Sequence, residues 1–228
     1  MAYKLLKEDR PVIRGVLFDM DGVILDSEVL YTRFWREAAE QMGFPMTMEI
    51  ALGLRSLSHD RGQKYLEQFF GPEVNYTAMR QLRIRLMDAW VEVHGVEPKP
   101  GAGELLDWLR ERKLPCAITT SSPTERVKAH LTPLGLYDKF DAICSVAQVA
   151  HGKPEPDIYL FGAETLGLRP EECLAVEDSP TGLLSAWRAG CRAVMVPDRD
   201  QPDKETLDRC FALADSLTDL KGLLEDLI

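Results

Sequence analysis

Residues 15–28 read GVLFDMDGVILDSE, and this stretch predicts a buried strand followed directly by a polar site. The run VLF is typical of a strand that is buried on both faces. Charge is costly in such a core, so Asp19 and Asp21 should lie where the strand leaves it. In an open α/β sheet, ligands bind beyond the carboxyl ends of the strands. The stretch therefore indicates a site, although DMDG alone is equally compatible with a solvated turn.

A recurring pattern after residue 99 predicts a parallel sheet covered by helices. Short apolar runs alternate with polar or glycine-containing turns and then with helical stretches, which is typical of α/β proteins. The expected strands are 15–18, 115–119, 140–146, 173–176 and 192–196. The expected helices are 104–113, 125–134, 157–166 and 181–189. The sequence therefore predicts an α/β fold with a Rossmann-like parallel sheet core.

Residues 29–97 break this alternation and predict an inserted α-helical cap. Their apolar residues recur at helical spacing, beginning with Leu30, Phe34, Ala38 and Met42. The stiff segment PKPG at 98–101 marks the end of the insert. Because the insert leaves the sheet just after the two aspartates, we expect it to form a lid over them. The expected domains are a discontinuous core, 1–27 with 99–228, and a cap, 28–98.

Three more polar clusters fall at or just after predicted strand ends. These clusters are Thr119–Ser122, Gly152–Pro154 and Glu177–Ser179. Taken singly, hydroxyls cap helices, a loop lysine is usually solvated, and an acidic pair can cap a helix. Together with Asp19 and Asp21, however, they place four polar clusters at one edge of one sheet. That coincidence favours a functional site.

The chemistry of these clusters is complementary. Four carboxylates would repel one another unless some are protonated or a cation lies among them; they belong to Asp19, Asp21, Glu177 and Asp178. Mg²⁺ fits best, because it accepts a few carboxylates and completes its shell with water and phosphate oxygens. Lys153 and the hydroxyls of Thr120 and Ser121 would form an anion site beside it. One carboxylate, already ionised at neutral pH, could then attack a phosphoryl group.

Composition excludes several other classes of protein. The 228 residues are 45% hydrophobic and 28% charged, no apolar segment is long enough to span a bilayer, and the chain can bury its own core as a monomer. The start MAYKLLKEDRP lacks the apolar centre of a signal peptide, so we expect a soluble cytoplasmic protein. A net charge of -10 opposes binding to nucleic acid or to a membrane surface. Five scattered cysteines without a C-x-x-C pair are expected to be reduced packing residues.

The four polar clusters resemble the motifs of the haloacid dehalogenase-like hydrolase superfamily. FDMDGVILDSE resembles its first motif, Thr120 its second, Lys153 in GKPEPDIY its third and VEDSPTG its fourth. Their order and spacing span almost the whole chain. The branch with a helical cap after the first motif, which includes β-phosphoglucomutase and many sugar-phosphate phosphatases, is the most similar.

The resemblance implies a role for each site residue. Asp19 would be the nucleophile that becomes an aspartyl phosphate, and Asp21 would protonate the leaving alcohol and then activate water. Mg²⁺ would be held by Asp19, the Asp21 backbone carbonyl, Asp178 and Glu177. Thr120 and Lys153 would bind the phosphoryl oxygens.

These roles imply a Mg²⁺-dependent phosphatase acting on a small phosphorylated metabolite, with a sugar phosphate as the expected substrate. An aspartate at position 21 favours phosphoryl transfer to or from oxygen, because dehalogenases and phosphonate-cleaving members of the family generally lack it. Two alternatives stay open, a sugar phosphomutase and a phosphate- or metal-binding module without turnover.

The cap should supply substrate recognition, although an arginine there is more often merely exposed. The candidates are Tyr31, Arg55, Arg83 and Arg85. Mutases resembling β-phosphoglucomutase carry a histidine at the position of Tyr31. With a reference pKa of about 10, tyrosine is a poor proton relay at neutral pH. We therefore rank the phosphatase above the mutase.

Overall fold

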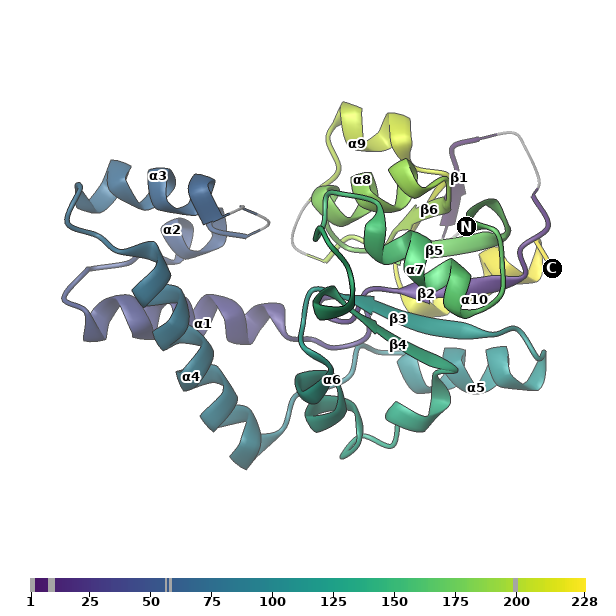
Figure 1. The fold of residues 1–228 in the computed structure, drawn as a ribbon, viewed down its shortest axis with the longest axis horizontal. Coiled ribbons are helices and arrows are strands. Elements are labelled where there is room, and N and C mark those ends of the chain that lie inside the picture. The colour runs from purple at the N-terminus through teal and green to yellow at the C-terminus, as the bar shows by residue number, and fades with distance from the viewer. Residues whose placement is uncertain (1–2, 8–10, 56, 58, 199–200) are drawn as a thin grey trace. The chain divides into compact units, whose positions relative to one another are not determined.

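A seven-stranded sheet forms the centre of the larger of two units of the chain (Figure 1). The structure is a computed structural model and describes residues 3–7, 11–55, 57, 59–198 and 201–228. The strand order is β1-β7-β6-β5-β2-β3-β4. The strands are β1 Tyr3–Leu5, β2 Gly15–Phe18, β3 Cys116–Thr120, β4 Ala142–Ser145, β5 Cys173–Glu177, β6 Arg192–Met195 and β7 Ala212–Ala214. All pair in parallel except β1, which runs antiparallel to β7. The predicted α/β class with a parallel sheet is confirmed.

The predicted strands all occur, but two others were missed and one was too long. β1 and β7 are only three residues each and pair with each other across almost the whole chain, so neither has a local signal. The segment predicted as a strand over 140–146 is a strand only at Ala142–Ser145, because Val146–Gln148 turns into a 3-10 helix. Ser145 is the N-cap of this 3-10 helix, and its side chain accepts a hydrogen bond from Ala147 N.

Six α-helices accompany the sheet in the described part of this unit. They are α5 Ala102–Glu111, α6 Thr124–Leu131, α7 Asp157–Thr165, α8 Pro180–Ala189, α9 Lys204–Arg209 and α10 Leu217–Glu225. Single-turn 3-10 helices occur at Tyr137–Lys139, Val146–Gln148 and Pro170–Glu172. Helices α7 and α8 pack beside each other on the sheet, and their apolar residues share one buried cluster with β2, β3, β5 and β6. α5 and α10 pack against each other.

Residues 27–96 form the second unit, which contains four helices within its described residues. They are α1 Glu28–Gln41, α2 Met48–Gly53, α3 His59–Phe70 and α4 Tyr76–His94. As the spacing predicted, Leu30, Phe34 and Ala38 are buried on one face of α1, which packs mainly against α4. Contacts divide the chain after Asp26 and before Glu97, within two residues of the expected boundaries. The action of this unit as a lid stays a prediction.

The two segments that join the units run side by side within the larger unit. Asp26 N donates to Glu97 O at 2.8 Å, and Lys99 N donates to Ile24 O at 2.8 Å. The Lys99 ammonium bonds Asp198 at 2.8 Å and Asp26 at 3.1 Å. Burial alone would lower the pKa of Lys99, but the hydrogen bonds to these two carboxylates outweigh it and raise that pKa. Lys99 therefore ties both segments to the loop after β6.

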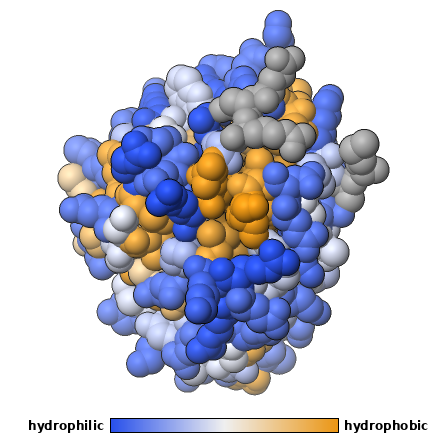
Figure 2. Space-filling view, turned by 90° about the vertical axis from the view of Figure 1, so that its right-hand side faces the viewer, coloured by the Kyte–Doolittle hydropathy of each residue, from blue (hydrophilic) through white to orange (hydrophobic). Residues whose placement is uncertain are grey.

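Figure 2 shows apolar residues gathered on part of one face, surrounded by hydrophilic ones. Among the described residues, exposed Val12 and Ile228 flank a backbone bond between Ile13 N and Leu227 O. None of the helices in the described ranges combines the length and the apolar character needed to cross a bilayer.

All five cysteines lie in the larger unit, and each is buried as a free thiol. Burial raises the pKa of Cys116 and of Cys173 to about 12, and that of Cys210 to about 11. The same cause raises the pKa of Cys144 and Cys191. These thiols are core residues with little thiolate character at neutral pH.

Close packing of α7 on the sheet gives a test of this architecture. A Cβ at Gly162 would lie 2.7 Å from Thr119 Cγ2 and 3.2 Å from Leu17 Cδ2. Gly162→Ala should therefore lower the free energy of unfolding by about 1–3 kcal/mol, since overpacking outweighs the better helix propensity of alanine. Urea unfolding measures the difference.

Gly103→Ala in α5 is the matched control, because the nearest atom to a Cβ there is Leu136 Cδ2 at 4.0 Å. It should leave stability unchanged or raise it by up to about 1 kcal/mol. Equal effects of the two substitutions would contradict the close approach of α7 to β2 and β3.

Candidate active site

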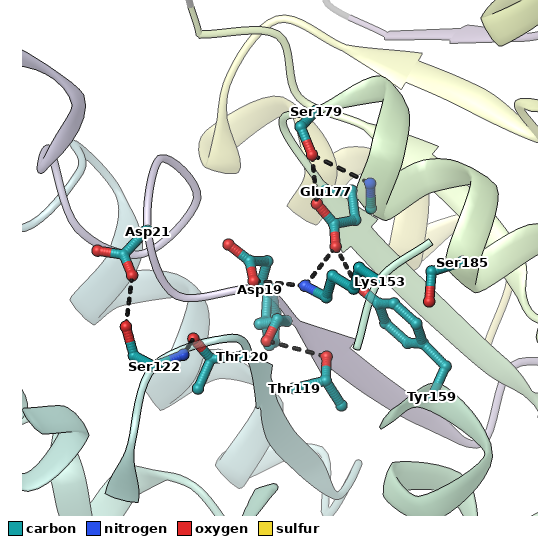
Figure 3. Close-up of polar contacts among 12 residues, drawn as sticks. Asp19, Asp21, Thr119, Thr120, Ser122, Lys153, Tyr159, Glu177, Ser179 and Ser185 are labelled. Atoms are coloured by element: carbon teal, nitrogen blue, oxygen red, sulfur yellow. Dashed lines mark hydrogen bonds and ion pairs between the residues drawn. The ribbon is translucent and has the colours of Figure 1, made fainter. Parts of the chain in front are cut away.

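The carboxyl ends of three neighbouring strands bring the predicted polar clusters together (Figure 3). Asp19 directly follows β2, Thr120 ends β3 and Glu177 ends β5. Because β2 lies between β3 and β5 and pairs in parallel with both, their ends meet at one edge. The loop between β4 and α7 adds Lys153 to the same place.

Lys153 is held between two buried carboxylates. Its Nζ lies 2.5 Å from Asp19 Oδ1 and 2.6 Å from Glu177 Oε1. The exposed fractions of these side chains are 9% for Lys153, 11% for Asp19 and 1% for Glu177. Burial lowers the pKa of Lys153, but the two carboxylates raise this pKa by more than burial lowers it. The net shift is upward, so the ammonium stays charged.

The surroundings of Asp19 raise its pKa. Burial raises the pKa of Asp19 from 3.8 to about 7, with added repulsion from Glu177 and Asp21 and opposition from Lys153. This pKa is higher than the ordinary aspartate value on which the sequence-based expectation of an ionised carboxylate rests. A positive charge added beside it would favour the ionised form.

Three of the four predicted carboxylates form a group that could hold a cation. One oxygen each from Asp19, Glu177 and Asp178 lies within 4.8 Å of the others. The turn at Gly22 closes against this group: its φ is +84°, and a Cβ there would lie 2.2 Å from Asp178 Oδ2. A bare backbone beside three hard oxygen donors fits a small divalent cation such as Mg²⁺.

The carboxylate of Asp21 is not part of that group. Its Oδ2 accepts a hydrogen bond from Ser122 Oγ at 3.1 Å (Figure 3). The side chain of Asp21 is thus directed toward the turn after β3, and four carboxylates do not converge on one point. Its backbone carbonyl stays the atom expected to face a metal.

The turn after β3 is held by several hydroxyl contacts. Thr120 is buried and its Oγ1 accepts from Ser122 N at 3.0 Å. Ser145 Oγ donates to Ser122 O at 2.8 Å. Ser121, expected to bind phosphate with Thr120, is exposed on this turn. Ser122 was not predicted as a site residue, although the run TTSS contained it.

Glu177 is enclosed by several groups, of which Tyr159 was not predicted from the sequence. The Tyr159 hydroxyl donates to Glu177 Oε1, and Ser179 Oγ donates to Oε2 at 3.4 Å. A Cβ at Gly182, in the first turn of α8, would lie 2.1 Å from the carboxylate. Tyr159 has an apolar body at a core position of α7, so its polar role had no signal in sequence periodicity.

The cap candidates lie in the smaller unit and are described within it. Arg83 is buried in α4, 4.5 Å from the Tyr31 ring centroid and 5.4 Å from that of Trp35. The expectation that Arg83 is an exposed arginine is wrong, because aromatic residues of α1 cover it. Arg55 Nε donates to Leu52 O at 3.3 Å, while Arg85 is exposed.

Comparison with known proteins places the chain in a family. The model of the haloacid dehalogenase-like hydrolases matches residues 13–190. Hexitol phosphatase A of Escherichia coli is 33% identical over 94% of this chain and 98% of that protein. Beta-phosphoglucomutase of Bacillus subtilis is 30% identical over 81% and 83%. A hydrolase of this family from Deinococcus radiodurans, solved with bound phosphate and sodium, is 31% identical with a TM-score of 0.76, covering 96% of this chain and 97% of that one.

The chain therefore belongs to the haloacid dehalogenase-like hydrolase family. This result confirms the family that the four motifs indicated. It also confirms the predicted class of enzyme, a phosphatase.

The pKa of Asp19 predicts a pH dependence of stability in metal-free protein. Its folded pKa of about 7 exceeds the unfolded value of 3.8, so the folded state holds the proton more tightly. The stabilisation is complete below about pH 4 and is lost as pH rises through 7, with an upper limit of about 4 kcal/mol. Asp19→Asn, which does not titrate, should lack this loss.

Urea unfolding in the presence of a chelator, from pH 4 to pH 8, measures the effect. The informative quantity is the slope of wild-type stability against pH minus that of Asp19→Asn, because the substitution also changes the pairing of Lys153. Parallel pH profiles for the two proteins would contradict a raised pKa.

Proposed function

We propose that this enzyme is a Mg²⁺-dependent phosphatase that transfers the phosphoryl group of a small phosphorylated metabolite to Asp19 and then to water. The observation that carries the proposal is the position of Asp19, directly after β2, where it lies 2.5 Å from the Lys153 ammonium and in one group with two other carboxylates that could hold a cation. A nucleophile needs this setting to approach an anion, because cationic groups must offset the repulsion between the two.

Each side chain then has a defined task. An Asp19 oxygen attacks phosphorus as the bond to the leaving oxygen breaks, and Lys153 balances charge on the phosphoryl oxygens. Asp21 gives a proton to the leaving alcohol and later takes one from the water that hydrolyses the aspartyl phosphate. Thr120 and Ser121 lie on the turn expected to bind the phosphoryl oxygens.

Mg²⁺ would be held by Asp19, Asp178 and the Asp21 carbonyl, with Glu177 nearby. When bound, it would neutralise negative charge on the phosphoryl group and on the carboxylates. The three-carboxylate group and the bare turn at Gly22 support this assignment.

A sugar or sugar-alcohol phosphate is the substrate class that we propose. It is supported by relatives named hexitol phosphatase A and phosphorylated carbohydrates phosphatase, at 33% and 29% identity. Tyr31 and Arg55 of the smaller unit stay our candidates for contacts with the sugar. Action as a cytoplasmic monomer, without nucleic acid or membrane partners, stays a prediction from sequence.

A sugar phosphomutase is the second candidate, because the Bacillus subtilis relative named beta-phosphoglucomutase is 30% identical. Tyr31 argues against it, because it stands where such mutases carry a histidine, and tyrosine, with a reference pKa of about 10, is a poor proton relay at neutral pH. A binding module without turnover is the third, and Asp21 beside the nucleophile disfavours it.

Removal of divalent cations should abolish phosphate release while leaving the fold intact, since the sheet core does not depend on the ion.

Asp19→Asn, with Mg²⁺ present, should lower kcat by about a thousandfold or more. Phosphate release from a panel of sugar phosphates, with circular dichroism as the folding check, tests both. Asp138→Asn, on an exposed 3-10 helix, is the control and should keep full activity.

Activity that survives exhaustive chelation would exclude the metal, and an active Asp19→Asn enzyme would mean that another group attacks. Glucose 1-phosphate with a bisphosphate primer is included in the panel. Its efficient conversion to glucose 6-phosphate, faster than phosphate release, would promote the mutase.

The role of Asp21 is tested by the leaving group. Asp21→Ala should slow release of a sugar alcohol by about a hundredfold or more, but release of an activated phenol much less, because a phenol needs little protonation as it departs. The ratio of kcat/KM for a sugar phosphate and for an aryl phosphate measures the effect. Equal losses for both substrates would remove Asp21 from the acid role.

A further inference from the structure

Tyr159 is a buried polar residue that none of the tasks above uses. Its side chain is completely buried, in the first turn of α7, and its hydroxyl donates to Glu177 Oε1 (Figure 3). The same oxygen accepts from Lys153 Nζ at 2.6 Å. Glu177 therefore receives one donor from the helix and one from the lysine that also bonds Asp19.

The position of the Lys153 ammonium depends on the donors to Glu177, because the ammonium is shared between Glu177 and Asp19. Lysine carries a compact charge on a flexible stem, so the pull of its partners decides where the ammonium lies. Asp19 Oδ1 and Glu177 Oε1 are at nearly equal distances from it, 2.5 and 2.6 Å. Any donor that satisfies part of the Glu177 carboxylate reduces the pull of that carboxylate on Lys153.

Tyr159 is also placed to limit the movement of Lys153. The ammonium lies 5.2 Å from the centroid of the Tyr159 ring, so the ring borders the space that Lys153 occupies. α7 itself cannot slide easily, because Gly162 packs closely against Thr119 and Leu17 of the sheet. A rigid helix thus fixes both the ring and the hydroxyl.

We propose that Tyr159 is a positioning residue. Its hydroxyl donates a hydrogen bond to Glu177 Oε1 and so weakens the attraction of that oxygen for Lys153. The Lys153 ammonium therefore stays bonded to the nucleophile Asp19 as well as to Glu177. The consequence for turnover rests on the proposed function, whereas the consequence for the position of Lys153 does not. Volume alone does not explain the residue, because phenylalanine would fill the same space without a hydroxyl that needs a partner.

Tyr159→Phe tests the proposal in two independent ways. In crystal structures without substrate, the distance from Lys153 Nζ to Asp19 Oδ1 should lengthen beyond hydrogen-bonding range, about 3.2 Å. In turnover, kcat should fall by about ten- to a hundredfold with KM changed little, as expected for loss of a group that orients a site residue. The melting temperature should stay close to that of the wild type.

Tyr137→Phe is the matched control, since it removes a tyrosine hydroxyl from a 3-10 helix of the same unit, and kcat should not change. A double-mutant cycle with Glu177→Gln tests whether Tyr159 acts through Glu177. If Tyr159 acts through Glu177, Tyr159→Phe should have little further effect on kcat in the Glu177→Gln background.

Tyr159→Phe with Lys153 in its original place and kcat within twofold of wild type would overturn the proposal. So would additive losses in the cycle, or a fall in kcat that simply follows a fall in melting temperature. A wild-type enzyme that releases no phosphate would instead reject the proposed function, and the Lys153 to Asp19 distance would still decide the role of Tyr159.

Discussion

Asp19, Glu177 and Asp178 form a group of three carboxylates, of which the Lys153 ammonium bonds the first two, and this excess of negative charge shapes the site. Buried charges are costly unless they are paired, and one lysine cannot balance three carboxylates. When all are ionised, two negative charges are left, which one divalent cation would neutralise. Burial is the main cause that raises the pKa of Asp19, and repulsion from Glu177 adds to it. This charge balance supports the proposed divalent cation.

The crowded charges can only meet because the backbone around them is bare. Gly22 and Gly182 lie so close to Asp178 and Glu177 that a Cβ at either position would overlap a carboxylate. The strand order then brings the remaining groups into range, since β2 lies between the strands that end in Thr120 and Glu177. Local backbone freedom and sheet topology therefore act together on the same few atoms.

The sequence was informative where local pattern and topology agree. An apolar run followed by charge located Asp19, and the alternation of strands and helices placed Lys153 and Glu177 at the same edge. The strands β1 and β7 were not found, because each is only three residues long and β1 pairs with residues more than 200 positions away. Tyr159 was not singled out, and Arg83 was expected to be exposed, for a related reason: packing against elements distant in sequence decides what their polar atoms contact.

The distribution of cysteines gives the molecule an internal reporter of motion. All five thiols lie in the sheet-containing unit, and residues 27–96 contain none. A thiol reagent can therefore label the protein only when the larger unit opens, whatever the helical unit does. Labelling rates would isolate the opening of the sheet from fluctuations of the cap, without any engineered probe.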